Sequence, residues 1–173
     1  MADSTKEVAR SVVFDEKDGP LTTTAWGESF RVRVGGVAVN HAYAILDDWA
    51  QVGSGPPRHL HRREDESFQL LEGRVALWTP AQTALLGPGD FIMIPKGTPH
   101  AWRALGPEPA RMALTIVPGG FEQFFLTAVA RGLTMNELDQ LVALGQSFGM
   151  DTVGPPLSDD EVQAIVAAHG APA

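Results

Sequence analysis

Short apolar segments separated by turn residues fill the first two thirds of the chain. Residues 29–34 read SFRVRV, in which polar and apolar side chains alternate, and a period of two is typical of a half-buried β-strand. A short apolar segment, VVF, precedes them at 12–14. Further candidate strands follow at roughly ten-residue spacing; they read SFQLLEG, RVALWT, TALL, DFIMI, HAWRAL and RMALTIV. Such a series predicts an all-β sandwich or barrel rather than βαβ units.

The glycine pair at residues 35 and 36 predicts a hairpin that leads from residues 29–34 into another strand over residues 37–46. On that strand His41 and Tyr43 would share one face, because side chains two residues apart point to the same side. Both are therefore candidates for a pocket wall. A packed position in the core or at the rim is the alternative for each.

The pattern changes to helical spacing after Pro118. The segment FEQFFLTAVARGL is apolar at helical spacing, and a capping box, in which Glu follows Ser or Thr after three residues, begins at Thr134 and again at Ser158. We therefore expect a polar tail over residues 1–9, a β-barrel over 10–118 and, over 119–173, two or three α-helices that pack on the barrel. About fifty residues would form only a marginal core of their own.

Composition and charge exclude several classes of function. The 173 residues carry a formal net charge of -8, which disfavours nucleic-acid partners and anionic membrane surfaces. The chain has no cysteine, so disulfides, thiolate ligands and cysteine nucleophiles are excluded. The N-terminus lacks the apolar segment of a signal peptide, and no run approaches the roughly 18 apolar residues of a membrane span. We expect a cytoplasmic protein.

The most distinctive polar stretch is HLHRREDE at residues 59–66. His59 and His61 would point to the same side of a strand, toward the barrel interior. The run RRED is polar enough for a solvated turn, and Glu66 then opens an apolar strand. A carboxylate buried there would need a metal or a hydrogen-bonding partner. Glu64 is the alternative carboxylate, in the middle of the expected turn.

A third histidine, His100, follows the turn PKGTP and begins the next candidate strand. Three histidines and one carboxylate from neighbouring strands would form a site for a divalent first-row metal with a position open to water or substrate. Taken singly, each residue has an ordinary alternative, which is a surface or core histidine or a solvated glutamate.

The spacing of these residues resembles the two conserved motifs of the cupin superfamily. Residues 53–73 have the form G-x5-H-x-H-x4-E-x6-G, and residues 89–100 have the form G-x5-P-x-G-x2-H. Ala104 departs from the asparagine usual after the second motif. The resemblance implies a single jelly-roll barrel that holds one divalent transition metal, which would be Fe, Mn, Ni, Co, Cu or Zn. It assigns the ligands as His59, His61, Glu66 and His100.

A finer resemblance covers more of the chain. The run from the first motif through PKGTPHAWR to PGGFEQFF, followed by the helical tail, is similar to single-domain bacterial quercetin 2,3-dioxygenases and quercetinase-like cupins. It implies an O2-dependent enzyme in which the metal activates an enolic or aromatic small molecule and Glu66 accepts its proton. Phe68, Trp102 and Met93 would line an apolar pocket, with plain core packing as their alternative. A homodimer is also implied.

Two other classes of function remain open on the same site. A non-oxidative cupin enzyme, such as an isomerase, cyclase, dehydratase or decarboxylase, would use the same Lewis acid together with Glu66. A non-catalytic small-molecule-binding protein would use the barrel alone. No helix-turn-helix is evident beside the barrel, which lowers the expectation of a transcriptional regulator.

Overall fold

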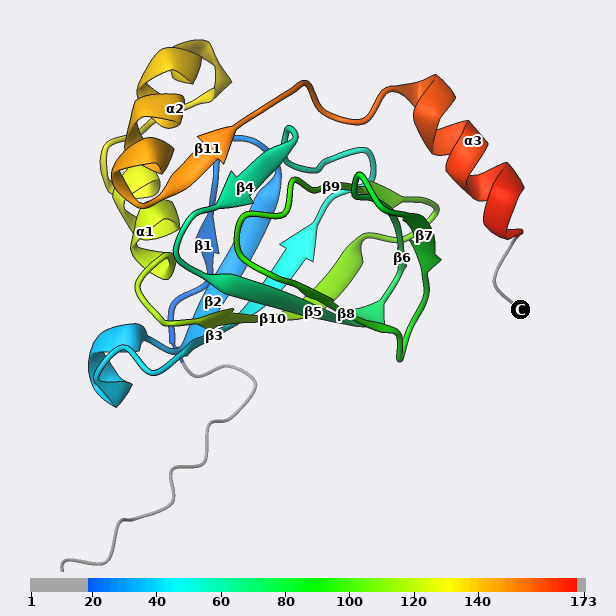
Figure 1. The fold of residues 1–173 in the computed structure, drawn as a ribbon. Helices are drawn as coiled ribbons and strands as arrows, with labels where there is room; N and C mark the ends of the chain where they lie inside the picture. The colour runs from blue at the N-terminus through cyan, green and yellow to red at the C-terminus, as the bar shows by residue number, and fades with distance from the viewer. Residues whose placement is uncertain (1–18, 171–173) are drawn as a thin grey trace, which may run out of the picture.

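The computed structural model describes residues 19–170, which form a β-sandwich with α-helices after the last long strand (Figure 1). The predicted all-β core with a C-terminal helical extension is confirmed. The expected strand at 12–14 and the tail at 1–9 lie outside the described residues. All strand pairs in the described residues are antiparallel, and most of them join strands that are not consecutive in the chain.

The strands described form three sheets. The six-stranded sheet has the order β1 (Thr22–Thr23), β2 (Glu28–Val34), β3 (Ala44–Ala50), β10 (Ala110–Val117), β5 (Asp65–Glu72) and β8 (Phe91–Ile94). The three-stranded sheet has the order β7 (Thr83–Leu86), β6 (Arg74–Trp78) and β9 (Ala101–Leu105). The third sheet has two strands, β11 (Met150–Thr152) and β4 (His59–His61).

One hydrophobic core fills the space between the two larger sheets. Leu114 of β10 stands opposite Leu46 of β3 and Phe68 of β5, and all three side chains are buried in the same cluster as Leu77 and Trp102 of the three-stranded sheet. Alternation along each strand therefore sends one set of side chains into the barrel and the other outward.

The C-terminal helices cover two sides of this sandwich (Figure 1). Helix α1 (Glu122–Ala130) and helix α2 (Leu138–Ser147) contribute to the main core, whereas Ile165 of α3 (Asp159–His169) packs against the outer side of the three-stranded sheet. Both capping boxes are confirmed. Thr134 begins the short 3-10 helix η2 (Met135–Glu137), and Ser158 begins α3.

The hairpin expected at the glycine pair is wrong. Gly36–Val39 forms a 3-10 helix, η1, and the next strand begins only at Ala44. The chain reverses through Asn40 and His41, whose φ angles of 51° and 59° are left-handed. A Cβ on Gly36 would lie 2.8 Å from the carbonyl carbon of Gly119. The glycine is thus needed for close approach of two backbone segments and not for a two-residue turn.

Strand β11 was missed in the segment that precedes Pro155-Pro156. Its three residues pair with β4, with Met150 opposite His61 and Thr152 opposite His59. Three residues without an alternating pattern carry too little signal to predict a strand. The pairing connects the C-terminal extension directly to the two histidines. No helix in residues 19–170 has the length and apolar character needed to cross a membrane.

The buried carboxyl group of Glu122 connects the start of α1 to η1. It accepts hydrogen bonds from the backbone N–H of Gly36 at 2.8 Å and of Gly120 at 2.6 Å, and the side chain is fully buried. We expect Glu122→Ala to lower the free energy of unfolding by about 3 kcal/mol, because two buried N–H donors lose a carboxylate acceptor. Urea denaturation measures this.

The matched control is Glu108→Ala, which makes the same change at an exposed residue. It should alter the free energy of unfolding by no more than about 0.5 kcal/mol. Equal effects of the two substitutions would contradict the role assigned to Glu122.

Candidate metal centre

Four side chains converge inside the barrel, with ligand atoms that all lie within 4.8 Å of one another. His59 and His61 come from β4, Glu66 comes from β5, and His100 precedes β9. The exposed fractions of these residues are 5%, 3%, 5% and 1% in that order. The backbones of His59 and His100 exchange two hydrogen bonds, of 3.0 and 2.8 Å. This pairing brings together motifs some forty positions apart in the sequence.

Backbone carbonyls set the orientation of two imidazoles. The Nδ1 atom of His59 donates to the carbonyl of Pro57 at 2.9 Å, and Nδ1 of His100 donates to the carbonyl of Thr98 at 3.0 Å. Because Nδ1 carries the proton in both rings, Nε2 keeps its lone pair for a ligand bond. Glu66 Oε2 lies 2.9 Å from Nε2 of His100 and 3.5 Å from Nε2 of His61.

The donor set fits a divalent transition metal. Both ring nitrogens of His61 are buried without a hydrogen-bond partner among the described residues, and buried polar atoms are rarely left so. A cation among the imidazole nitrogens and the Glu66 carboxylate would satisfy Nε2 of His61. Nitrogen and oxygen ligands suit the divalent first-row metals, but affinity order does not select one of them.

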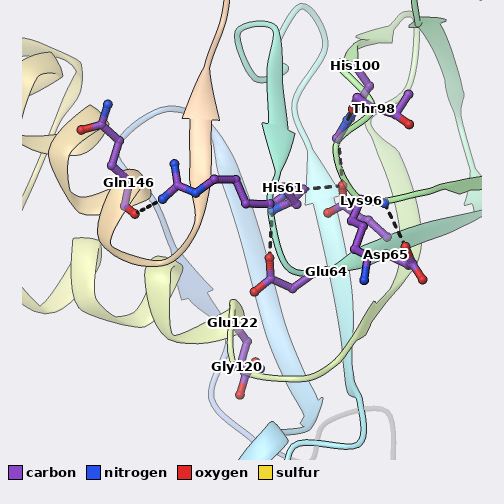
Figure 2. A network of polar contacts seen from close by, with 11 residues as sticks. His61, Glu64, Asp65, Lys96, Thr98, His100, Gly120, Glu122 and Gln146 are labelled. Atoms are coloured by element: carbon purple, nitrogen blue, oxygen red, sulfur yellow. Dashed lines mark hydrogen bonds and ion pairs between the residues drawn. The ribbon is translucent and has the colours of Figure 1, made fainter.

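Glu64 is not the solvated turn residue that the sequence predicted. Only 6% of it is exposed, and its Oε2 lies 3.8 Å from Nδ1 of His61, as Figure 2 shows. That distance is too long for a hydrogen bond, so the interaction is electrostatic. Arg62 and Arg63 are exposed as expected, and Arg62 also bonds to Asp151 and to the carbonyl of Gln146. One carboxylate in this charged run, that of Glu64, therefore points inward. It faces Nδ1 of His61, whereas Glu66 faces Nε2 of the same ring.

The electrostatics favour the ligand forms of Glu66 and His59, whereas His61 has to give up a proton to a metal. Burial alone would raise the pKa of Glu66, but His61 and His100 outweigh it and hold that pKa well below its usual range. Burial, with the neighbouring His100 and His61, lowers the pKa of His59 to about 3. Burial also acts to lower the pKa of His61, but the Glu66 and Glu64 carboxylates raise it overall. An ionised carboxylate and a neutral His59 imidazole are the ligand forms.

The C-terminal extension supplies one wall of this site. The ring of Phe121, which immediately precedes α1, meets the ring of His61 edge-on, with centroids 4.4 Å apart at 83°. Phe121 is itself buried and stacks on Phe124. The centre is therefore enclosed by barrel strands and by the start of α1, which keeps bulk water from the ligands.

The structure brings only two of the five expected pocket residues into the barrel. Phe68 and Trp102 are buried, with ring centroids 6.5 Å apart. Met93 is 57% exposed on the outer face of β8, because Ile92 and Ile94 occupy the inward positions. His41 and Tyr43 are exposed, since the strand expected to carry both is replaced by η1 and a turn.

Trp102 also borders a hollow of about 260 Å³ whose lining includes none of the four candidate ligands. It is lined by Gly53, Gly55, Trp102, Arg103, Pro156 and Leu157.

Two buried acids inside the barrel were not predicted. Glu28 of β2 accepts a hydrogen bond from Nε1 of Trp26 at 3.0 Å, and Asp48 of β3 stands between Phe30 and Met112 on the neighbouring strands. Both acids are buried. The sequence does hold a signal for the inward direction of Asp48, because this residue falls on the same two-residue period as the inward positions of AILDDWA. An aspartate in a strand usually belongs to the outer face.

Burial raises the pKa of Glu28 to about 7. The hydrogen bond from Trp26 acts to lower this pKa, and the negative charge of Glu66 acts to raise it. Burial, followed by the charges of Glu28 and Glu66, raises the pKa of Asp48 well above its usual range. These electrostatic interactions place Glu28, Asp48 and Glu66 in one group within the barrel interior. Asp48 therefore favours the protonated form, Glu66 favours the ionised form, and Glu28, with a pKa of about 7, lies between them.

Comparison with known proteins agrees with this architecture. Residues 50–117 match a family model described as a cupin domain. A stretch of 69 residues, 40% of this chain, is 42% identical to the quercetin 2,3-dioxygenase of Bacillus subtilis (strain 168). That match spans 20% of the length of the curated relative.

Solved structures with similar folds show the fold alone, because their sequence identities are low. KdgF from Halomonas sp. is 18% identical with a TM-score of 0.57, over 65% of this chain and 99% of KdgF. The polyketide cyclase RemF from Streptomyces resistomycificus is 21% identical with a TM-score of 0.53, over 63% and 80%. Ectoine synthase from P. lautus is 16% identical with a TM-score of 0.51, over 80% and 84%.

We expect His59→Ala to abolish stoichiometric metal binding, because it removes one nitrogen ligand and leaves three. Metal analysis of protein purified without added metal should fall from about one ion per chain to nearly none. His169→Ala is the control, since His169 is exposed and bonds to Thr83. Unchanged metal content in His59→Ala would contradict the ligand assignment.

The buried Glu28 predicts a pH dependence of stability. Its folded pKa of about 7 lies above the ordinary value of 4.5, so its contribution is fully present below pH 4.5 and is lost as pH rises through about 7. The loss amounts to about 3 kcal/mol. Glu28→Gln should remove this part of the pH dependence, measured by urea denaturation of the metal-free protein at pH 5 and pH 8. Identical pH profiles for both proteins would contradict the assignment.

Proposed function

The chain contains a cupin domain, and from that premise we propose that the protein is a metal-dependent dioxygenase acting on an enolic or aromatic small molecule. The observation that carries the proposal is the buried set of three histidines and one glutamate. The 42% identity of part of the chain to a quercetin 2,3-dioxygenase supports the oxygenase class. The ligand set was expected from the spacing of the two motifs, and the likeness to quercetin 2,3-dioxygenases from the run that continues through PKGTPHAWR to PGGFEQFF.

The proposed ligands are His59, His61, Glu66 and His100. A divalent metal bound there would act as a Lewis acid and lower the pKa of a substrate hydroxyl group. The carboxylate of Glu66 accepts the hydroxyl proton, because it is ionised and lies among the imidazoles where that hydroxyl would bind. Loss of that proton leaves an electron-rich enolate.

The remaining parts of the site hold the substrate and exclude water. Phe68, Trp102 and Phe121 are buried aromatic side chains of the core that contains the site, and they suit a flat aromatic ligand. O2 is the oxidant, and in a dioxygenase reaction both of its atoms remain in the products. One O2 is therefore consumed for each substrate molecule, with no external reductant.

A second candidate is a non-oxidative acid–base enzyme on the same scaffold. The observation that favours it is the contrast between Glu66, whose pKa is held well below its usual range, and Glu28, whose pKa is raised to about 7. Carboxyl groups with separated pKa values can serve as base and acid in one reaction. Such an enzyme would convert its substrate without consuming oxygen.

Oxygen uptake with flavonols and other enolic aromatics separates the two candidates. We expect one O2 consumed per molecule of substrate converted. Glu66→Gln should retain measurable metal but reduce turnover by at least about 100-fold, since general-base catalysis contributes about 10²–10⁴. An oxygen electrode and metal analysis measure the two effects.

Glu108→Gln is the matched control at an exposed position and should leave both turnover and metal content unchanged. Turnover without oxygen consumption would refute the oxygenase proposal. Unchanged turnover in Glu66→Gln would remove Glu66 from the chemistry.

A further inference from the structure

The inward face of β3 carries one polar side chain among apolar ones. Ala44, Leu46 and Ala50 belong to the hydrophobic core, and Asp48 shares their face because side chains alternate along a strand. Its cross-strand neighbours, Phe30 and Met112, are core residues as well. The carboxyl group of Asp48 is thus directed into the barrel.

The adjacent residue, Asp47, is an aspartate whose carboxylate is paired, and it serves as a comparison for Asp48. Asp47 points the other way and forms ion pairs with Arg33 at 2.6 Å and Arg111 at 3.7 Å. No ion pair joins Asp48 to a cation within residues 19–170. Its Oδ1 atom is buried without a hydrogen-bond partner among the described residues, and only 7% of the residue is exposed.

A buried oxygen without a partner is normally matched by water or by a ligand. Glu28 and Glu66 interact electrostatically with Asp48, so this oxygen belongs to the same interior as the proposed metal ligands. The side chains of its neighbours Phe30 and Met112 are apolar and cannot donate a hydrogen bond to this oxygen. The position of the Asp48 carboxyl group among core residues therefore points to a hydrogen-bonding partner that is a bound ligand.

We propose that Asp48, with Glu28 beside it, forms a second polar site in the barrel that hydrogen-bonds a hydroxyl group of the substrate at the end remote from the metal. The inference rests on the proposed function, because it takes the substrate to occupy the barrel interior. Asp48 is thereby a specificity-determining residue that selects among aromatic substrates by their hydroxyl groups.

The chemistry of the site defines the class of ligand. The buried Oδ1 of Asp48 is open to a hydrogen bond, and burial, which holds the pKa of Asp48 well above its usual range, lets that carboxyl group donate as well as accept. A hydroxyl group both donates and accepts, so it matches this site. A carboxylate or phosphate would place negative charge against two buried acids, Asp48 and Glu28, and is disfavoured. The substrate is therefore an uncharged hydroxylated aromatic compound.

The test compares two flavonols under anaerobic conditions on the full chain loaded with metal. Quercetin carries hydroxyl groups on both ring systems, whereas 3-hydroxyflavone carries only the enolic hydroxyl. We expect wild-type protein to bind quercetin at least about tenfold more tightly, the ratio that one additional hydrogen bond provides. Isothermal titration calorimetry measures both dissociation constants.

Asp48→Leu should reduce this preference to about one while leaving the metal content unchanged. It should also raise the melting temperature, since an unpaired buried carboxyl group is replaced by an apolar side chain beside Phe30 and Met112. A purely structural role predicts the opposite shift in melting temperature. Asp48→Asn should retain most of the preference, because the amide both donates and accepts hydrogen bonds.

Asp47→Asn is the matched control on the same strand. It weakens the ion pairs with Arg33 and Arg111 on the outer face and should leave the ratio of the two dissociation constants unchanged.

Equal affinity of the wild-type protein for the two flavonols, or binding of neither, would overturn the second polar site, whether or not Asp48→Leu folds. So would an unchanged preference in Asp48→Leu. The proposed function fails separately. If quercetin is bound with the expected preference but no oxygen is consumed in air, the dioxygenase proposal is wrong and the second site remains.

Discussion

The arrangement depends on one constraint, which is that the carboxylate of Glu66 is buried at the centre of a hydrophobic barrel. An ionised carboxylate removed from water is costly unless it is paired. Here Nε2 atoms of His100 and His61 lie 2.9 and 3.5 Å from it. A proton or a metal ion held between these nitrogens and the carboxylate supplies the pairing, and the two histidines outweigh burial in setting the pKa of Glu66. His59 and His100 in turn are fixed through Nδ1 by backbone carbonyls, so the backbone orients two of the three imidazoles.

That backbone is held in place from two directions. The bridge between His59 and His100 joins the two motif segments. Strand β11, from the C-terminal extension, pairs antiparallel with β4, the strand that carries His59 and His61. Phe121 closes the site beside His61, and Glu122 ties the next residues to Gly36 through buried hydrogen bonds. The helical extension is thus part of the site and not only a cover for the barrel.

The sequence predicted the features that depend on local pattern and on spacing. Alternating strands, both capping boxes and the residues that cluster at the centre could all be derived from the chain. Features that depend on contacts between distant segments could not. Glycines at 35 and 36 are compatible with a hairpin, and only the close approach of Gly119 to Gly36 explains why a glycine is needed there. Glu64 and Asp48 are polar residues at inward positions, and their direction is set by strand register.

The central claim is that three histidines and one glutamate hold a single divalent metal in this barrel. X-ray absorption at the metal edge of the purified protein tests it most directly. The account predicts nitrogen and oxygen ligands at about 2.0–2.2 Å, with the multiple scattering of three imidazole rings and no sulfur. A spectrum without imidazole scattering, or a protein that binds no metal when divalent ions are supplied, would contradict it.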